Sequence, residues 1–153
     1  MARRILEGVE GLKALAGEHA GYSDWLEITQ ERVDQFADAT LDHQWIHVDP
    51  ERAKTESPFG GPIAHGYLTL SLLPYLLDQV IEVRGVAMAI NYGMNRLRYP
   101  APVPVGSRVR LGVTLAGVEE IRGGVQCQLD CQVEVADQAK PALVAEVVFR
   151  YYG

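Results

Sequence analysis

Two side chains that can move protons lie close together in the first third of the chain. Asp42 and His47 stand five positions apart in the segment DHQWIHVDP. A carboxylate can hold a water molecule and orient an imidazole, and an imidazole with an ordinary pKa of about 6.5 can transfer a proton near neutral pH. The pair indicates acid–base chemistry. A turn aspartate at a helix end beside a structural histidine is the alternative that fits the same spacing.

A glycine follows this pair where an apolar segment begins. Gly66, in the string GPIAHGYLTL, has no Cβ, so a ligand can approach its backbone N–H closely. If a helix starts there, that N–H has no partner within the helix and lies at the positive end of the helix dipole. An oxygen that gains negative charge could be stabilised at this point. The simpler interpretation of Gly66 is a tight junction, and His65 is more simply a hydrogen-bonded structural histidine than a second base.

A metal site is another possible use of the same polar residues. Its ligands would be Asp42, His43, His47 and Asp49. Their irregular spacing matches none of the usual zinc patterns, so we predict that no metal ion is bound.

Helices are predicted on both sides of the loop that carries the candidate acid–base pair. Thr29 can cap a helix over 30–40, and the following loop then begins near Asp42. A second short helix is predicted over 50–56. Because both ends of the loop are fixed by helices, the side chains of Asp42 and His47 can converge.

Two further helices are expected. The segment from about 65 to 83 is apolar on nearly all sides, which is typical of a buried helix. Pro74 cannot donate to the Leu70 carbonyl and should bend this helix. A short helix over 5–18 is predicted within an N-terminal helical extension of about 1–20, weakened by glycines.

After residue 85 the hydrophobic period changes to two, which is typical of half-exposed antiparallel strands. The alternation covers 109–115, 125–135 and 143–151. An earlier strand is expected over 86–99, bulged near Gly93. Helices followed by strands, with one apolar helix that a sheet could wrap, predict a single α+β domain over 1–153 with helices on one face of an antiparallel sheet.

The charge balance argues against a nucleic-acid partner. The 153 residues include 14 Lys plus Arg and 20 Asp plus Glu, which gives a formal net charge of −6. Nucleic-acid binders usually show a basic face. Four arginines do fall close together in sequence, either as solvated strand positions or as phosphate contacts. They are Arg96, Arg98, Arg108 and Arg110.

The sequence also argues against a membrane or secreted setting. The most apolar run, 67–80, is shorter than the roughly 20 residues of a membrane helix. No apolar segment typical of a secretory signal follows the basic N-terminus. Cys127 and Cys131 lie in an alternating strand, ~13 Å apart at ~3.3 Å per residue, which is too far for a disulfide. We therefore expect buried free thiols and a cytoplasmic protein.

Three strings together resemble the MaoC-like dehydratase family, in its NodN-like branch. They are DHQWIHVDPERA, SPFGGPIAHGYLTLSLLPYLL and NYGMNRLRYPAPVPVGSRVR, and the resemblance runs from about residue 22 to the C-terminus. It implies the hotdog fold, in which an antiparallel sheet wraps a long central helix. Members that are (R)-specific enoyl-CoA hydratases add water to a trans-2-enoyl-CoA and give the (R)-3-hydroxyacyl-CoA.

The resemblance also implies roles for individual residues. In the hydratase motif Asp-x-Asn-Pro-x-His, Asp42 and His47 match the catalytic pair, whereas Gln44 and Trp45 replace Asn and Pro. That departure is typical of the NodN-like branch. The family's oxyanion glycine corresponds to Gly66. The implied mechanism needs no metal or redox cofactor, and the CoA thioester is the substrate.

Further residues are candidates for substrate binding. Gln44 could hold the loop by its amide or be a surface residue, and Trp45 could line the acyl pocket or pack in the core. Asn91 and Arg96 are expected near the acyl or pantetheine path. The full set of oxyanion and substrate-binding candidates is Gln44, Trp45, His65, Gly66, Asn91 and Arg96.

The resemblance thus implies reversible hydration of a trans-2-enoyl-CoA. A homodimer is expected because hotdog sheets commonly pair edge to edge and the family's acyl tunnel lies near the subunit interface. The alternatives are a hotdog acyl-CoA thioesterase, an acyl-carrier-protein dehydratase and a non-catalytic module that binds acyl thioesters.

Overall fold

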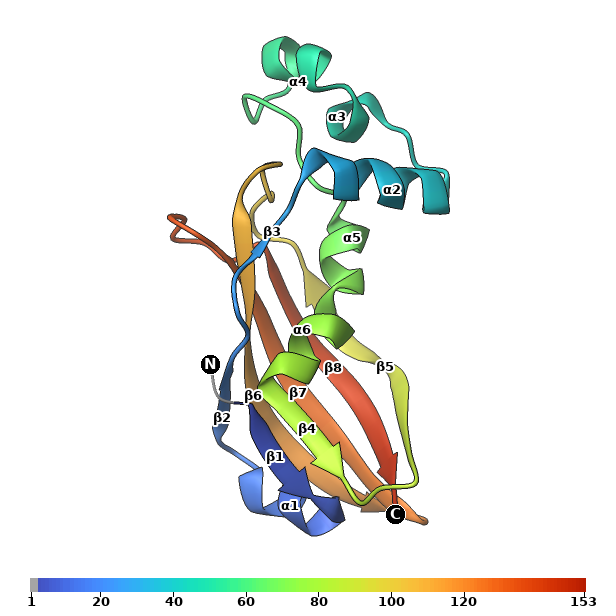
Figure 1. The fold of residues 1–153 in the computed structure, drawn as a ribbon. Helices are drawn as coiled ribbons and strands as arrows, with labels where there is room; N and C mark the ends of the chain where they lie inside the picture. Colours follow the sequence, from blue (N-terminus) through green and yellow to red (C-terminus); the bar gives the residue numbers. More distant parts are fainter. Residues whose placement is uncertain (1–2) are drawn as a thin grey trace.

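The computed structural model describes residues 3–153, and an antiparallel sheet is its largest element (Figure 1). The six strands of the sheet are β2 (His19–Tyr22), β3 (Leu26–Glu27), β5 (Met88–Arg98), β6 (Arg108–Ile121), β7 (Gly124–Val135) and β8 (Leu143–Tyr152). They follow the order β2-β6-β7-β8-β5, and β3 also pairs with β6. The predicted α+β class with an antiparallel sheet is confirmed.

The apolar residues that alternate along the sequence are the buried residues of these strands. One face of β7 is fully buried, and it includes both cysteines as free thiols. Burial raises the pKa of Cys127 to about 11 and that of Cys131 to about 12, so both thiols stay protonated near neutral pH. In β5 the pairing with β8 shifts between Asn91 and Gly93, where the bulge was expected.

The apolar segment predicted as one helix forms two, α5 (Gly66–Ser71) and α6 (Leu73–Val80), and the chain then becomes strand β4 (Ile81–Arg84). The helices separate at Leu72, and Pro74 lies in the first turn of α6, where its missing N–H costs no helical hydrogen bond. Figure 1 shows both helices against one face of the sheet. The bend predicted at Pro74 is therefore a break between two helices at Leu72, and the second helix ends before residue 83.

One expectation about these helices is wrong for the single chain. The segment was expected to be buried on all sides, yet Tyr67 is 69% exposed and Tyr75 is 57% exposed. Tyr67 belongs to α5 and Tyr75 to α6, so each helix leaves an aromatic side chain exposed. Leu68, Leu76 and Val80, in contrast, are buried against the sheet.

The N-terminal region differs from the predicted helix over 5–18. Its first residues form strand β1 (Arg4–Glu7), which pairs in parallel with β4, and helix α1 (Gly8–Leu15) follows. The backbone turns at Gly8, whose φ of 65° lies in the left-handed region that favours glycine. Pairing with a distant strand therefore replaces the first turn of the expected helix. Residues 1–2 of the expected extension lie outside the described part.

A second layer lies beyond one end of the sheet and contains α2 (Gln30–Thr40), α3 (Trp45–Val48) and α4 (Pro50–Glu56) (Figure 1). The caps predicted from the sequence are present: the Thr29 hydroxyl accepts the Arg32 N–H at 3.1 Å, and the Asp49 carboxylate caps α4. Helix α3 was not predicted, because residues 42–48 were expected to form a loop. None of the helices over residues 3–153 has the length and apolar character that a membrane crossing requires.

Candidate active site

Three polar side chains converge where the helical layer meets α5. One ligand atom from each of Asp42, His47 and His65 lies within 4.8 Å of the other two. Asp42 follows Leu41, whose left-handed backbone ends α2, and its side chain is half-exposed. His47 comes from α3, His65 is the residue directly before the first turn of α5, and both are buried. The structure thus brings the two candidate acid–base residues together and adds a second imidazole.

The imidazole of His47 is oriented by its backbone contact. Its Nδ1 lies 2.7 Å from the carbonyl oxygen of Ile63. Because a carbonyl only accepts, Nδ1 carries the proton and the Nε2 of a neutral ring has a free lone pair. Burial is the main cause that lowers the pKa of His47, and His65 lowers it further, against the opposing effects of Ile63 and Asp42. His47 is therefore suited to act as a proton acceptor.

His65 contacts both members of the pair. Its Nε2 donates to the backbone carbonyl of Asp42 at 3.0 Å and lies 3.9 Å from the Asp42 carboxylate. Its ring stacks on that of His47, with 3.9 Å between centroids and 27° between planes, and Phe36 contacts it at 5.0 Å. Its Nδ1 is buried and has no hydrogen-bond partner among the described residues. No local sequence pattern indicates the contact with Asp42, which is 23 positions away.

The same atoms bear on the possibility of a metal site. The His65 nitrogen nearest the Asp42 carboxylate carries a proton, and a protonated nitrogen has no lone pair for a metal ion. Two other ligands suggested by the sequence are directed elsewhere. His43 pairs with Asp38 at 2.9 Å, and Asp49 caps α4.

Gly66 is the first residue of α5 and directly follows His65. Its N–H lies in the first turn, where no carbonyl of the helix can accept it. A Cβ at this position would lie 3.0 Å from Cε1 and 3.1 Å from Cζ of Tyr99, so the tyrosine ring would have to move by a few tenths of an ångström to admit a side chain. The ring of Tyr99 thus closes one side of the glycine, a contact that no local sequence pattern indicates.

The other predicted site residues take different positions. Gln44 is exposed, and it is its backbone N–H, not its side-chain amide, that reaches the Asp42 carboxylate, at 3.3 Å. Trp45 is half-buried beneath the guanidinium of Arg52 rather than in the core. Asn91 and Arg96 are exposed on β5, away from the Asp42–His47 pair. Asn91 lines a cavity beside α5, as expected for a residue near the acyl path, whereas Arg96 lies 3.8 Å from the Glu146 carboxylate.

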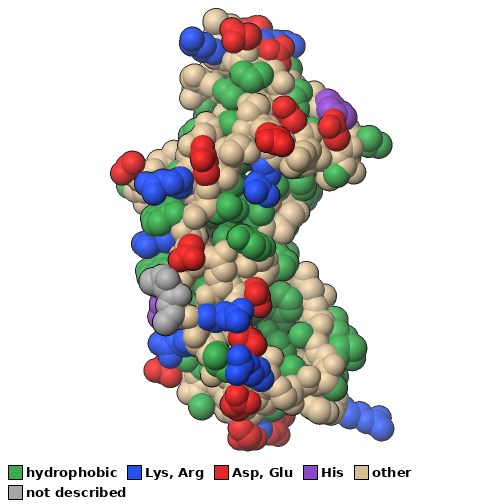
Figure 2. Space-filling model, in the orientation of Figure 1, with side chains coloured by type: hydrophobic (Ala, Val, Ile, Leu, Met, Phe, Trp, Pro, Cys, Tyr) green, Lys and Arg blue, Asp and Glu red, His purple; other side chains and the backbone are tan. Residues whose placement is uncertain are grey.

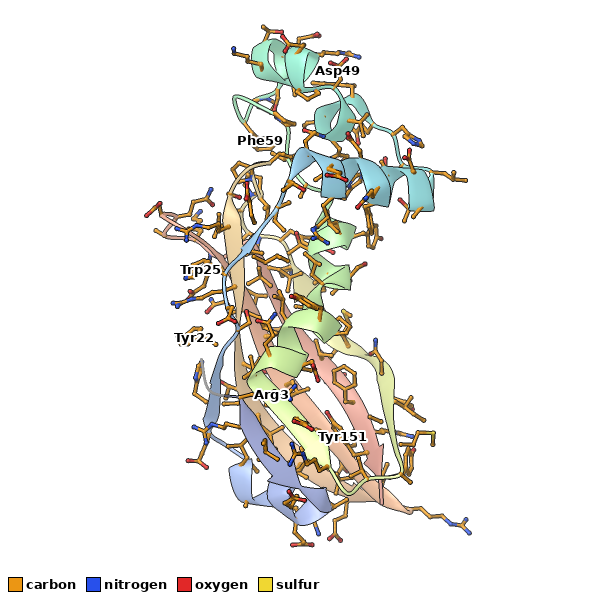
Figure 3. The ribbon with its side chains drawn as sticks, viewed as in Figure 1. Arg3, Tyr22, Trp25, Asp49, Phe59 and Tyr151 are labelled. Atoms are coloured by element: carbon orange, nitrogen blue, oxygen red, sulfur yellow. The ribbon has the colours of Figure 1, made fainter. Side chains whose placement is uncertain are left out.

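An apolar groove runs from α5 along the sheet. It consists of two cavities of about 250 and 260 Å³, and both are lined by Pro74 and Phe149. The first lies between α5, α6 and β5, and the second reaches Tyr151 and Leu12 beyond α6. Figure 2 shows hydrophobic side chains gathered in this hollow, and Figure 3 shows Tyr151 on the face of β8 that looks towards α6 and β4. The groove could hold an extended apolar group.

Comparison with known proteins gives consistent results. Residues 12–136 match the family model described as the MaoC like domain. The chain is 59% identical over 149 residues to 3-hydroxyacyl-thioester dehydratase Z of Mycobacterium tuberculosis, covering 97% of this chain and 98% of that protein. It is 46% identical over 132 residues to nodulation protein N of Rhizobium leguminosarum, covering 84% and 81%.

A solved structure supports the same relationship. The (R)-hydratase of A. caviae, described as involved in PHA biosynthesis, superimposes with a TM-score of 0.71 at 27% identity, over 86% of this chain and 95% of that chain. The predicted hotdog fold is confirmed, with its central helix divided into α5 and α6.

Proposed function

We propose that this chain, which belongs to the MaoC like domain family, is a hydro-lyase that adds water reversibly to a trans-2-enoyl-CoA to give the (R)-3-hydroxyacyl-CoA. The observation that carries the proposal is the convergence of the Asp42 carboxylate and the His47 imidazole next to the start of α5. Family membership supports the reaction class, and the geometry supports the assignment of steps.

In the hydration direction, water lies between the Asp42 carboxylate and Nε2 of His47. The carboxylate accepts one hydrogen bond and orients the water, and Nε2 takes a proton as the water oxygen bonds C3. The electrons of the C2–C3 double bond move toward the thioester, whose oxygen becomes negative and is held by the Gly66 N–H. His47 then returns the proton to C2, and the carbonyl forms again. Dehydration follows the same steps in reverse.

The apolar groove supports an acyl substrate. It begins beside Leu70 and Ser71, one turn beyond Gly66, so a thioester held at the start of α5 would direct its chain between the helices and the strands β5 and β8. Burial of methylene groups stabilises binding by ~0.8 kcal/mol each. The lining is mostly apolar, as a hydrocarbon chain requires.

The proposed reaction needs no metal ion or other cofactor. The imidazole supplies the proton transfer, and the backbone amide supplies the stabilisation of charge. We place the reaction in the cytoplasm, in keeping with two free cysteines rather than a disulfide.

The active form is proposed to be a homodimer. Strand β5 lies at the edge of the sheet and is exposed on both faces, with Met88 51% and Tyr92 57% exposed. The exposed tyrosines of α5 and α6, Tyr67 and Tyr75, add to this apolar surface. A second copy would cover an edge that otherwise invites pairing with other chains. Light scattering at the mass of two chains supports this arrangement, whereas the mass of one chain contradicts it.

An assay with crotonyl-CoA tests the function. Loss of the enoyl absorbance without release of free CoA thiol, with (R)-3-hydroxybutyryl-CoA as the product, is the expected result. Free thiol would instead indicate a thioesterase, and binding without turnover would indicate a non-catalytic module. The same acyl group on an acyl carrier protein tests the carrier.

A further inference from the structure

We propose that His65 is a positioning residue that fixes the Asp42 carboxylate relative to the His47 imidazole. Its Nε2–H holds the backbone carbonyl of Asp42, and its ring stacks on the ring of His47. The inference rests on the proposed function, because it concerns how the hydration site is assembled.

The first contact places the carboxylate. Helix α2 ends at Leu41, so Asp42 stands on a loop outside the helical hydrogen bonding. The Nε2–H of His65 holds its carbonyl oxygen at 3.0 Å, whereas the carboxylate Oδ2 lies 3.9 Å from that nitrogen, beyond hydrogen-bond distance. The hydrogen bond therefore restrains the backbone and leaves Oδ2 available for water. His65 itself is only 2% exposed, so its ring has little room to move.

The second contact places the imidazole. The His47 ring is held at its edge by the carbonyl of Ile63 and on its face by the ring of His65. Phe36 of α2 packs against His65 and limits its movement. One short segment, 63–66, thus holds His47, restrains Asp42 and offers the Gly66 N–H for the thioester oxygen.

The unpartnered Nδ1 indicates why the residue is a histidine. A buried acceptor without a partner is unfavourable, and such groups in folded proteins call for an explanation. A leucine would avoid this loss but could not donate to Asp42, and a glutamine could donate but would not stack on His47. An aromatic ring that carries an N–H donor at the position of Nε2 can both bind the Asp42 carbonyl and stack on His47. The second ring nitrogen, Nδ1, is then left without a partner.

Two substitutions separate the contacts. His65→Phe keeps an aromatic ring and removes the donor, whereas His65→Gln places an amide N–H near the position of Nε2 and removes the ring. We expect His65→Phe to lower kcat for crotonyl-CoA about 10-fold or more, since small displacements of catalytic groups have effects of this size, with KM within about twofold. His65→Gln is expected to keep at least about a third of the wild-type kcat, because the restraint on Asp42 returns and the Ile63 carbonyl still holds the His47 ring after the stacking contact is lost.

Thr69→Val is the matched control. Thr69 is also buried on α5, and among the described residues no hydrogen bond or ion pair joins it to Asp42 or His47. Valine keeps its backbone hydrogen bond to His65, so kcat should stay at the wild-type value. Wild-type kcat in His65→Phe, or an equal loss in His65→Gln, would overturn the inference. A general structural role would lower the amount of folded protein in all three variants without this order of kcat values.

A measurement that needs no turnover separates this inference from the proposed function. In ¹⁵N spectra of the wild-type protein, Nε2 of His65 should carry a proton, because it donates to the Asp42 carbonyl. The backbone amide signals of Asp42 and Gln44 should shift in His65→Phe and stay near their wild-type positions in His65→Gln. A neutral ring with its proton on Nδ1, which could not donate to Asp42, contradicts the inference even in a protein that hydrates crotonyl-CoA. Absence of turnover with the expected spectra would contradict only the proposed function.

Discussion

The Nδ1–H of His47 donates to the backbone carbonyl of Ile63 across 2.7 Å. This hydrogen bond joins the helical layer to the strand-like segment that leads into α5. It also determines which nitrogen of the ring is available for chemistry, because Nε2 is left without a proton while the ring is neutral. The assignment of His47 as the base rests on this relationship.

Removal of either member of the pair should abolish most of the turnover. We expect His47→Gln and Asp42→Asn each to lower kcat/KM for crotonyl-CoA at least ~10²-fold, the scale of losing a general acid–base group. Steady-state kinetics measure this loss. Asp38→Asn is the matched control, because Asp38 is a carboxylate of α2 that pairs with exposed His43. Wild-type rates in both site variants would refute the assignment.

The pH dependence of the reaction follows from the state of His47. Burial and His65 lower the pKa of His47 below its ordinary value of 6.5. The base must be neutral, so kcat/KM should be constant above this pKa and fall as the pH decreases through it. The midpoint of the acid limb is therefore expected below 6.5. A midpoint above that value, or a rate that rises toward acid pH, would contradict neutral His47 as the base.

Local sequence patterns were sufficient to predict several helices and strands. The helices α2 and α4 form where their caps were predicted, because a side-chain oxygen at Thr29 or Asp49 can satisfy an amide without help from distant residues. The strands β6, β7 and β8 follow the alternation of apolar residues, which is a property of neighbouring positions.

Features that depend on distant contacts were missed. The first residues of the N-terminal helix became β1 because they pair with β4, which lies far along the chain. The contact of Tyr99 with Gly66 and that of His65 with Asp42 likewise join residues that no local pattern relates. The sequence therefore indicated the acid–base pair and the glycine, and only the fold revealed the groups that hold them in place.

Removal of metal ions tests the absence of a cofactor. Turnover of crotonyl-CoA should be unchanged after prolonged dialysis against EDTA, because the proposed steps use only Asp42, His47 and the Gly66 N–H. Kinetics before and after dialysis, with metal analysis of both samples, measure the effect. A loss of activity that returns on addition of a divalent cation would show that the three clustered side chains serve a different chemistry.

The length of the accepted acyl chain should depend on Phe149. This side chain lines both cavities of the groove and stands between them together with Pro74. Phe149→Ala should join the cavities, so the ratio of kcat/KM for oct-2-enoyl-CoA to that for crotonyl-CoA should rise about 10-fold, since single methylene groups change specificity by this order. Truncation of a half-buried ring also costs stability. The ratio of two substrates on one preparation is independent of the folded fraction.

The matched control is Val148→Ala, which shortens an apolar side chain on the opposite face of β8 and should leave the ratio unchanged. An unchanged ratio in Phe149→Ala would mean that the acyl chain does not pass between Phe149 and α6.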